Sequence, residues 1–324
     1  GEDEDEEIGV KATNCPGHCH VFGTRLRSYR ELPLRMAEFS RLHRNERSGT
    51  LNGLARVRSF AQDDAHIFCE PEQVGSEVQS FFDMMAEIYK ALGLEGVTFA
   101  VSTRPEEFLG EVSDWDVAEK MLVDCVEGAG FDCSIKQGEA VFYGPKVEAD
   151  FLDVLGRKWT LGTIQIDMAM PGRFGLEYVG RDGEKHQPAM LHRAVLGSIE
   201  RFMAIYIVHT GGDFPFWLSP VQVAILPISQ AQHARATEIR KTLIAAGLRA
   251  EVDERSETLG FKIRETEINK IPLSLVIGEK EVEAGTVTPR LRKSKKETFE
   301  PRGLDELVGE LVASTNARQM GPLS

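Results

Sequence analysis

The sequence contains no apolar run of about 18 or more residues, so nothing in it reads as a transmembrane helix. It has no basic start of the signal-peptide kind either, because residues 1–7 are GEDEDEE. Cysteines are few, odd in number (5) and scattered, which argues against a disulfide framework and for a reducing compartment. These three features together lead us to expect a cytoplasmic protein. Since 42% of the residues are hydrophobic and 27% are charged, we also expect a packed core.

Charge is distributed unevenly along the chain. From Pro220 onward there are 16 basic and 15 acidic residues, whereas residues 1–219 hold 22 and 36, which together make the net charge of -13. A negative field slows the encounter with nucleic acid, but a local basic cluster can still bind phosphate. Residues 290–296, RLRKSKK, form such a cluster, although charge alone would fit a solvated hairpin tip equally well.

A proline-rich passage, DFPFWLSP at residues 213–220, separates two regions with different patterns. We therefore predict two domains, residues 1–216 and residues 217–324.

In the first region, apolar residues three and four apart predict an amphipathic helix from Val74 to Leu92 that ends at Gly93. Residues 56–68 and 160–170 are predicted to be extended, and residues 193–208 to form a second long helix. Strands and helices mixed without regular alternation predict an α+β domain with a largely antiparallel sheet.

In the second region, apolar strand patterns alternate with helical ones, which predicts a small α/β domain with a mostly parallel sheet. The predicted strands are residues 221–228, 248–252 and 273–277, and the predicted helices run through residues 239–246, 261–268 and 304–311.

Nitrogen and sulfur donors of the kind that bind metals are concentrated in NCPGHCH, residues 14–20. His66 and His192 add two more in polar or basic surroundings. A catalytic zinc ion takes three protein ligands and keeps one position open. Because neither CxxC nor HExxH occurs, spacing alone leaves both a metal site and ordinary partly buried side chains open.

A cationic stretch, RVRSFAQ, follows at residues 56–62. Strand alternation would place Arg56, Arg58, Phe60 and Gln62 on one face. Guanidinium groups match phosphate geometry and an aromatic ring can stack on a purine, although an ordinary exposed strand would show the same pattern.

Several collinear motifs resemble those of a known family. HRNE at 43–46, the strand through Phe60 and GSIER at 197–201 are similar to motifs 2 and 3 of the class II aminoacyl-tRNA synthetases. Further motifs narrow the resemblance to the threonyl-tRNA synthetase family: NCPGH at 14–18, LPLRMAEF at 32–39, QDDAHIF at 62–68, FYGPK at 142–146 and HRA at 192–194.

The resemblance implies a class II antiparallel sheet with flanking helices, followed by a small α/β anticodon-binding domain. It also implies a threonine–tRNA ligase, which activates L-threonine with ATP to threonyl-adenylate and transfers it to tRNA(Thr). One Zn²⁺ per chain on Cys15, His66 and His192 is implied, as is Mg²⁺ with ATP.

The family's other site residues carry over by position. Arg44 and Arg201 correspond to its catalytic arginines. Positions matching its threonine pocket are Gln62, Asp64, Tyr143 and Gln165; those matching its ATP site are Arg44, Glu46, Arg56, Phe60, Ser198 and Arg201; those matching its anticodon contacts are Glu281 and Arg290.

Five departures from the family pattern stand out. The sequence begins after motif 1, whose strand and helix build the homodimer that the resemblance implies, and it contains no editing domain. Thr13 replaces a usual methionine, Thr160 a usual glutamine and Ser256 a usual asparagine.

Two alternatives remain at this stage. A catalytically silent paralogue could keep the fold in order to bind tRNA, although its arginines and metal positions would be free to change. A synthetase for proline or serine would share motifs 2 and 3, but the Cys15, His66 and His192 set suits a substrate with vicinal amino and hydroxyl groups.

Overall fold

The computed structural model describes residues 9–292 and 300–323. The chain divides into two compact units, Gly1–Lys90 with Leu94–His209, and Ala91–Gly93 with Thr210–Ser324. In the described part of the chain, no helix has both the length and the apolar content needed to cross a membrane.

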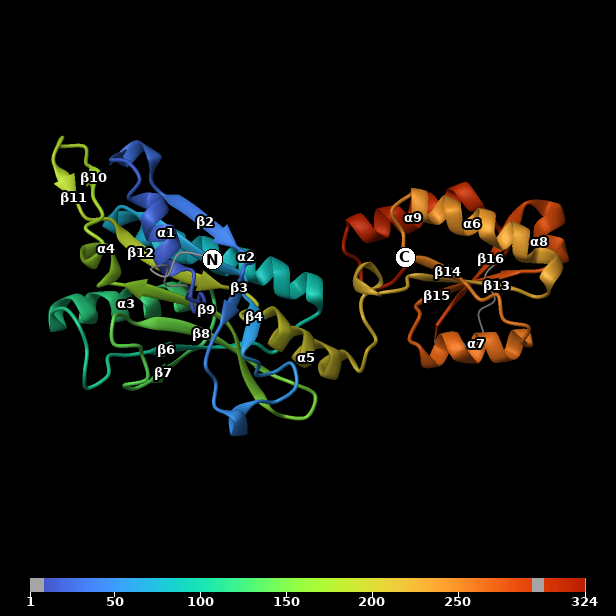
Figure 1. The fold of residues 1–324 in the computed structure, drawn as a ribbon, viewed down its shortest axis with the longest axis horizontal. Coiled ribbons are helices and arrows are strands. Elements are labelled where there is room, and N and C mark those ends of the chain that lie inside the picture. The colour runs from blue at the N-terminus through green and yellow to red at the C-terminus, as the bar shows by residue number, and fades with distance from the viewer. Residues whose placement is uncertain (1–8, 293–299, 324) are drawn as a thin grey trace, which may run out of the picture. The chain divides into compact units, whose positions relative to one another are not determined.

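A seven-stranded sheet forms the centre of the first unit (Figure 1). All neighbouring strands in it are antiparallel except β6 and β7, as expected from the sequence. In spatial order the strands are β2 (Leu34–Glu38), β5 (Asp64–Cys69), β12 (Ala189–Ala194), β9 (Lys158–Asp167), β8 (Lys146–Leu152), β6 (Thr98–Ser102) and β7 (Cys133–Lys136).

Among the described residues of this unit, two smaller sheets and five α-helices accompany the large sheet. One small sheet pairs β1 (Arg27–Ser28), β10 (Tyr178–Val179) and β11 (Lys185–His186), and the other is the hairpin β3 (Arg41–His43) and β4 (Ser59–Ala61). The helices are α1 (Cys15–Phe22), α2 (Val74–Leu92), α3 (Val112–Gly128), α4 (Met170–Arg173) and α5 (Ile199–Thr210).

Helix α2 has the predicted bounds. Its apolar stripe is buried, with Val78 and Met85 at most 1% exposed, and Gly93 follows with the positive φ of 67° that ends many helices. Helix α3 was not predicted, although its buried Trp115 and Leu122 carry the same kind of periodic signal.

Two sequence predictions in this unit are wrong in detail. Residues 56–68 do not form one continuous strand, because β4 pairs with β3 whereas β5 belongs to the seven-stranded sheet, and Gln62 and Asp63 separate the two strands. The helix expected over 193–208 starts only at Ile199, since the buried strand β12 continues to Ala194. A fully buried strand and a helix both supply apolar residues, so their boundary is hidden in the hydrophobic pattern.

The second unit is a five-stranded sheet covered by helices on both faces, with α6 and α9 on one face and α7 on the other (Figure 1). The strands, in spatial order, are β14 (Ala250–Val252), β13 (Val223–Pro227), β15 (Leu273–Ile277), β16 (Thr286–Leu291) and β17 (Arg302–Gly303). The helices are α6 (His233–Ala245), α7 (Leu259–Ile268), α8 (Glu279–Ala284) and α9 (Leu304–Asn316).

The first three of these strands are parallel, whereas β16 and β17 are antiparallel to their neighbours. The prediction of a mostly parallel sheet is therefore wrong, and the sheet is mixed. The short helix α8 returns the chain at the end of the sheet at which β15 ends, so β16 runs antiparallel to β15.

Phe216 lies in the core of the second unit, with no exposed surface. Its backbone N–H donates to the carbonyl of Met320 at 3.0 Å, and its carbonyl accepts from Gln222 Nε2 at 3.1 Å. The proline-rich passage thus supplies a core residue to this unit.

We predict that a fragment of residues 210–324 folds alone and is about 3–5 kcal/mol more stable than one of residues 220–324, because the shorter one lacks the buried Phe216 ring. Urea unfolding of the two fragments measures the difference. A fragment of residues 213–324, which keeps Phe216, should match the longer one; equal stability of all three would contradict the role of this residue.

Candidate functional site

Cys15, His66 and His192, far apart in sequence, meet in the first unit. His66 on β5 lies directly opposite His192 on β12, and Cys15 begins α1. Their ligand atoms all lie within 4.8 Å of one another, and Cys15 Sγ is 3.4 Å from His192 Nδ1. These are the three side chains that the family resemblance implied as zinc ligands.

The two histidines have opposite electrostatic surroundings. Burial, together with the neighbouring imidazoles, lowers the pKa of His66 to about 2, and its Nε2 is buried without a hydrogen-bond partner in the described structure. Burial also lowers the pKa of His192, but the hydrogen bond from Nε2 to Asp167 Oδ2 at 2.7 Å and the contact with Cys15 outweigh it and raise the pKa to about 9.

This donor set fits a zinc ion. One thiolate and two imidazoles form a typical three-ligand catalytic zinc shell, and the unpartnered Nε2 of His66 is accounted for if it faces a metal. The other donors of the NCPGHCH segment are not among the three clustered ligands. His18 bonds to His66, the Cys19 thiol donates to the sulfur of Met190, and His20 is exposed.

Polar side chains surround the cluster. Asp64 accepts a hydrogen bond from Asn14 Nδ2 at 2.9 Å, and burial raises the pKa of its carboxyl. Tyr143 Oη donates to Gln165 Oε1 at 3.0 Å, and Gln165 lies opposite His192 on β9. The structure therefore brings together three of the four positions expected to bind substrate.

Gln62, the fourth, lines a neighbouring cavity of about 220 Å³. Tyr143 connects the two regions, since both Cys15 and Arg44 act on its hydroxyl electrostatically. All six positions that match the ATP site line this cavity: Arg44, Glu46, Arg56, Phe60, Ser198 and Arg201.

The three arginines that line the cavity already contact other groups of the protein. The Arg44 guanidinium lies 5.1 Å from the centre of the Phe60 ring, and Arg201 Nε donates to the carbonyl of Ala55 at 2.8 Å. Arg56 Nη2 forms an ion pair with Glu46 Oε2 at 2.9 Å. A half-exposed ion pair contributes at most about 1 kcal/mol, so a phosphate could replace this carboxylate at little cost.

Arg58 does not share the face predicted for it. It lies in a bend before β4, and its side chain donates to the carbonyl of Glu46 and to Ser48 Oγ. The alternation rule fails here because regular strand geometry begins only at Ser59.

Asp63 is a site residue that the sequence did not reveal. Its carboxylate accepts three backbone N–H groups, from Val195, Leu196 and Gly197, at 2.7–3.0 Å. Burial raises the pKa of this carboxyl to about 6, although the three donors oppose that effect. Asp63 thereby fixes the loop between β12 and α5, and this loop sets the positions of Ser198 and Arg201, which follow it. In the sequence, the only sign of this role was that Asp63 stands next to Asp64.

Thr13 and Thr160, which differ from the family pattern, both contact specific side chains. Thr13 Oγ1 lies 3.0 Å from Cys15 Sγ, while Thr160 Oγ1 donates to Asp150 Oδ1 at 2.7 Å and lines the 220 Å³ cavity. Nothing in the described contacts explains the choice of Ser256.

In the second unit, Glu281 and Arg290 lie on α8 and β16. Glu281 caps its own helix through the N–H of Gly278 and accepts from Thr288, whereas Arg290 Nε is buried without a hydrogen-bond partner in the described residues. Within the basic segment, Arg292 is buried in an ion pair with Asp213, and residues 293–299 lie outside the described structure.

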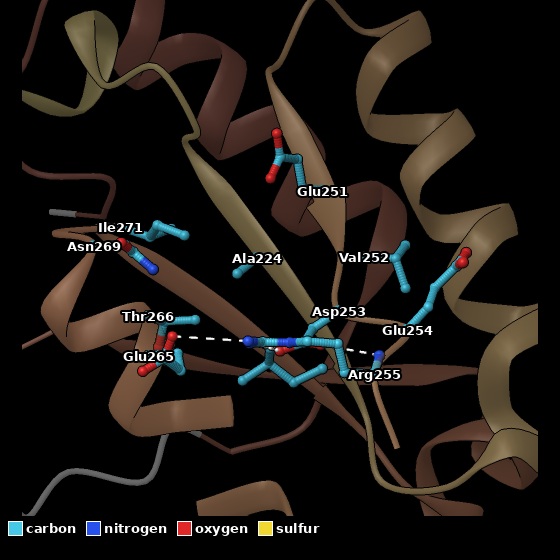
Figure 2. Close-up of a pocket in the computed structure, with 11 residues that line it drawn as sticks. Ala224, Glu251, Val252, Asp253, Glu254, Arg255, Glu265, Thr266, Asn269 and Ile271 are labelled. Carbon is cyan, nitrogen blue, oxygen red and sulfur yellow. Dashed lines mark hydrogen bonds and ion pairs between the residues drawn. The ribbon is translucent and has the colours of Figure 1, made fainter. Parts of the chain in front are cut away.

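A cavity of about 590 Å³ on this unit has acidic walls (Figure 2). Glu251, Glu254 and Glu265 contribute carboxylates to it, and Arg255 lies across it toward Glu265, paired at 3.7 Å. This negative lining does not suit phosphate, and neither Glu281 nor Arg290 belongs to it.

Comparison with known proteins defines the class. The family described as "tRNA synthetase class II core domain (G, H, P, S and T)" matches residues 1–210, and the "Anticodon binding domain" family matches residues 222–314. The fold is thus that of a class II aminoacyl-tRNA synthetase core joined to an anticodon-binding domain, as the sequence motifs led us to expect.

Individual relatives narrow this further. A threonine–tRNA ligase of Halorhodospira halophila is 49% identical over 310 residues, covering 96% of this chain and 48% of the relative. Crystal structures of threonyl-tRNA synthetases are also similar. The RNA binding domain of the Cryptosporidium parvum Iowa II protein has a TM-score of 0.91 at 41% identity, covering 100% of this chain and 80% of that one. The threonyl-tRNA synthetase ThrRS-1 of Aeropyrum pernix has a TM-score of 0.82 at 31% identity, covering 98% of this chain and 76% of that one.

The chain belongs to the threonyl-tRNA synthetase family. It spans about half the length of the curated relatives it matches.

We predict that Asp63→Ala speeds the hydrogen exchange of the amides of residues 195–197 by about 10- to 100-fold, because each buried N–H left without an acceptor costs about 1–3 kcal/mol. Exchange measured by mass spectrometry on a peptide over this loop tests it. Asp63→Asn, which retains one acceptor oxygen, should give an exchange rate between those of the wild type and Asp63→Ala. Asp83→Ala, on the exposed face of α2, is the control and should exchange like the wild type. Unchanged protection in Asp63→Ala would show that the loop is held by other contacts.

Proposed function

We propose that this chain is the catalytic and anticodon-binding part of a threonine–tRNA ligase, which activates L-threonine with ATP and transfers it to tRNA(Thr) in the cytoplasm. One observation carries the proposal: a Cys/His/His cluster beside a cavity lined by Arg44, Phe60 and Arg201. All five cysteines are free, in keeping with a reducing compartment. A homodimer, which the family resemblance implies, stays a prediction.

The amino acid would bind at the cluster. Asp64 Oδ2 is held by Asn14, which leaves Oδ1 to accept from the substrate hydroxyl group. Tyr143, in the turn before β8, and Gln165, on β9, would contact the amino group. A zinc ion held by Cys15, His66 and His192 would supply an open coordination position that polarises the amino and hydroxyl groups.

ATP would occupy the cationic cavity, with Mg²⁺ accompanying its phosphates. Phe60 would stack on adenine and Glu46 would read its edge once its ion pair with Arg56 opens. Attack of the threonine carboxylate on the α-phosphorus requires alignment and charge neutralisation rather than a proton-transfer group. Arg44 would neutralise the α-phosphate, while Arg56 and Arg201 would take up the charge of the departing pyrophosphate.

The alternative of a silent paralogue gains no support from this site, because the residues that the resemblance assigns to metal and ATP are brought together intact.

We predict that threonine-dependent ATP–pyrophosphate exchange occurs on this chain and that valine is activated roughly 10⁴-fold less efficiently. Valine is nearly isosteric with threonine, but its methyl group leaves Asp64 without the expected donor. Serine carries the same two polar groups, so it should be activated measurably.

Metal analysis should find about one zinc per chain, and Cys15→Ala should remove both zinc and exchange activity, whereas Cys133→Ala should retain both. Metal-free protein that still preferred threonine to valine would refute the assignment.

For tRNA binding, we predict that Arg290→Ala weakens the affinity for tRNA(Thr) by about 1–3 kcal/mol, because its guanidinium would lose contacts to the anticodon. Filter binding over a range of salt concentrations measures the effect, and wild-type affinity should fall as salt rises. Lys241→Ala, an exposed change on α6, is the control. Equal losses in both variants, or none in either, would count against anticodon reading by Arg290.

A further inference from the structure

His18 contacts His66, one of the three residues of the metal-binding cluster. It follows Cys15 by three residues on α1 and is 8% exposed. Its Nδ1 is 2.7 Å from His66 Nδ1, and the two rings meet edge to face with centroids 4.8 Å apart. Neither the fold nor the proposed chemistry has so far required this contact.

The contact constrains where the protons are. Two ring nitrogens 2.7 Å apart form a hydrogen bond only if one carries a proton and the other does not. His66 itself belongs to the Cys15, His66 and His192 cluster. Because Nδ1 is engaged by His18, the ring nitrogen left for a metal is Nε2, which is buried and has no hydrogen-bond partner in the described structure.

A metal binds the ring nitrogen that has no proton. If Nε2 is the ligand, the proton of neutral His66 must sit on Nδ1, and this N–H must donate to Nδ1 of His18. His18 must then carry its own proton on Nε2. That atom faces an anion, since Glu38 Oε1 lies 3.5 Å away, and Lys11 holds the other Glu38 oxygen at 3.2 Å.

We propose that His18 is a positioning residue for the metal centre: it holds His66 in the Nδ1–H tautomer with Nε2 directed at the metal, and Glu38 orients His18 in turn. The inference rests on the proposed function in one respect, namely that a metal occupies the cluster. It adds residues that the sequence motifs did not assign to the site.

The three ligands are supported in three different ways. His192 is backed by the carboxylate of Asp167, Cys15 by the hydroxyl of Thr13, and His66 by the neutral ring of His18. A neutral acceptor fixes the direction of a ligand without adding negative charge beside the metal. Such outer-shell partners typically contribute 10- to 100-fold to metal affinity.

The test compares two substitutions in the zinc-loaded chain. In His18→Asn, Oδ1 takes the position of Nδ1 and can still accept from His66, whereas His18→Leu has similar bulk but no acceptor. Chelator competition should show zinc affinity weakened about 10- to 100-fold in His18→Leu and within about threefold of wild type in His18→Asn. His20→Asn, an exposed change on the same helix, should bind zinc like the wild type.

A second measurement needs no variant. Long-range ¹H–¹⁵N spectra of the zinc-bound wild-type chain, labelled at histidine, report which ring nitrogen of each histidine carries the proton. We expect His66 with its proton on Nδ1 and His18 with its proton on Nε2. Ligation of His66 through Nδ1, or wild-type zinc affinity in His18→Leu, would overturn the role of His18 alone. A wild-type chain that takes up no zinc would instead contradict the metal centre on which the proposed function depends, and this inference with it.

Discussion

The register of three antiparallel strands is the constraint on which the site depends. In β5, β12 and β9 it aligns His66, His192 and Gln165 in one row across the sheet. Because side chains alternate between the faces of a sheet, a slip of one residue would turn a histidine to the opposite face and dismantle the cluster. The register is held by burial on both faces, since β5 is buried along its whole length. The packing that holds the register of the sheet therefore also brings the site residues together.

Local pairing explains how an acidic unit can present a cationic cavity. Several carboxylates near the site are engaged by specific donors: Asp63 by backbone amides, Asp167 by His192, and Glu200 by the N–H of Ala61. Their charges hold the framework in place, while Arg44 and Arg201 line the cavity. Net charge governs encounter over distances comparable to the Debye length, about 10 Å at 0.1 M salt, whereas binding depends on the groups inside the cavity.

In most cases the sequence predicted an element of the fold where its apolar residues follow a clear period, and missed it where they do not. Helix α2 and most elements of the second unit were predicted from the pattern of their apolar residues, whereas β16, β17 and α8 were not. The start of α5 was missed because the buried strand β12 precedes it without a change in hydrophobicity. The break between β4 and β5 was missed because neither glycine nor proline stands at Gln62 and Asp63 to mark it. Mixed pairing in the second sheet follows from α8, which was too short to show a helical period.

The sequence by itself determined the family, the two-part organisation and the residue types suited to zinc and ATP, because motifs and periodicity are local properties of a chain. It could not determine from spacing alone that Cys15, His66 and His192 meet, since they come from separate elements. Nor could it distinguish Arg56, which lines the cavity, from Arg58, which does not. The contacts of Asp63 with residues 195–197 and of His18 with His66 exist only in the folded state. Only the tertiary structure decided these points, because each depends on a distance between side chains that only packing of the sheet and helices defines.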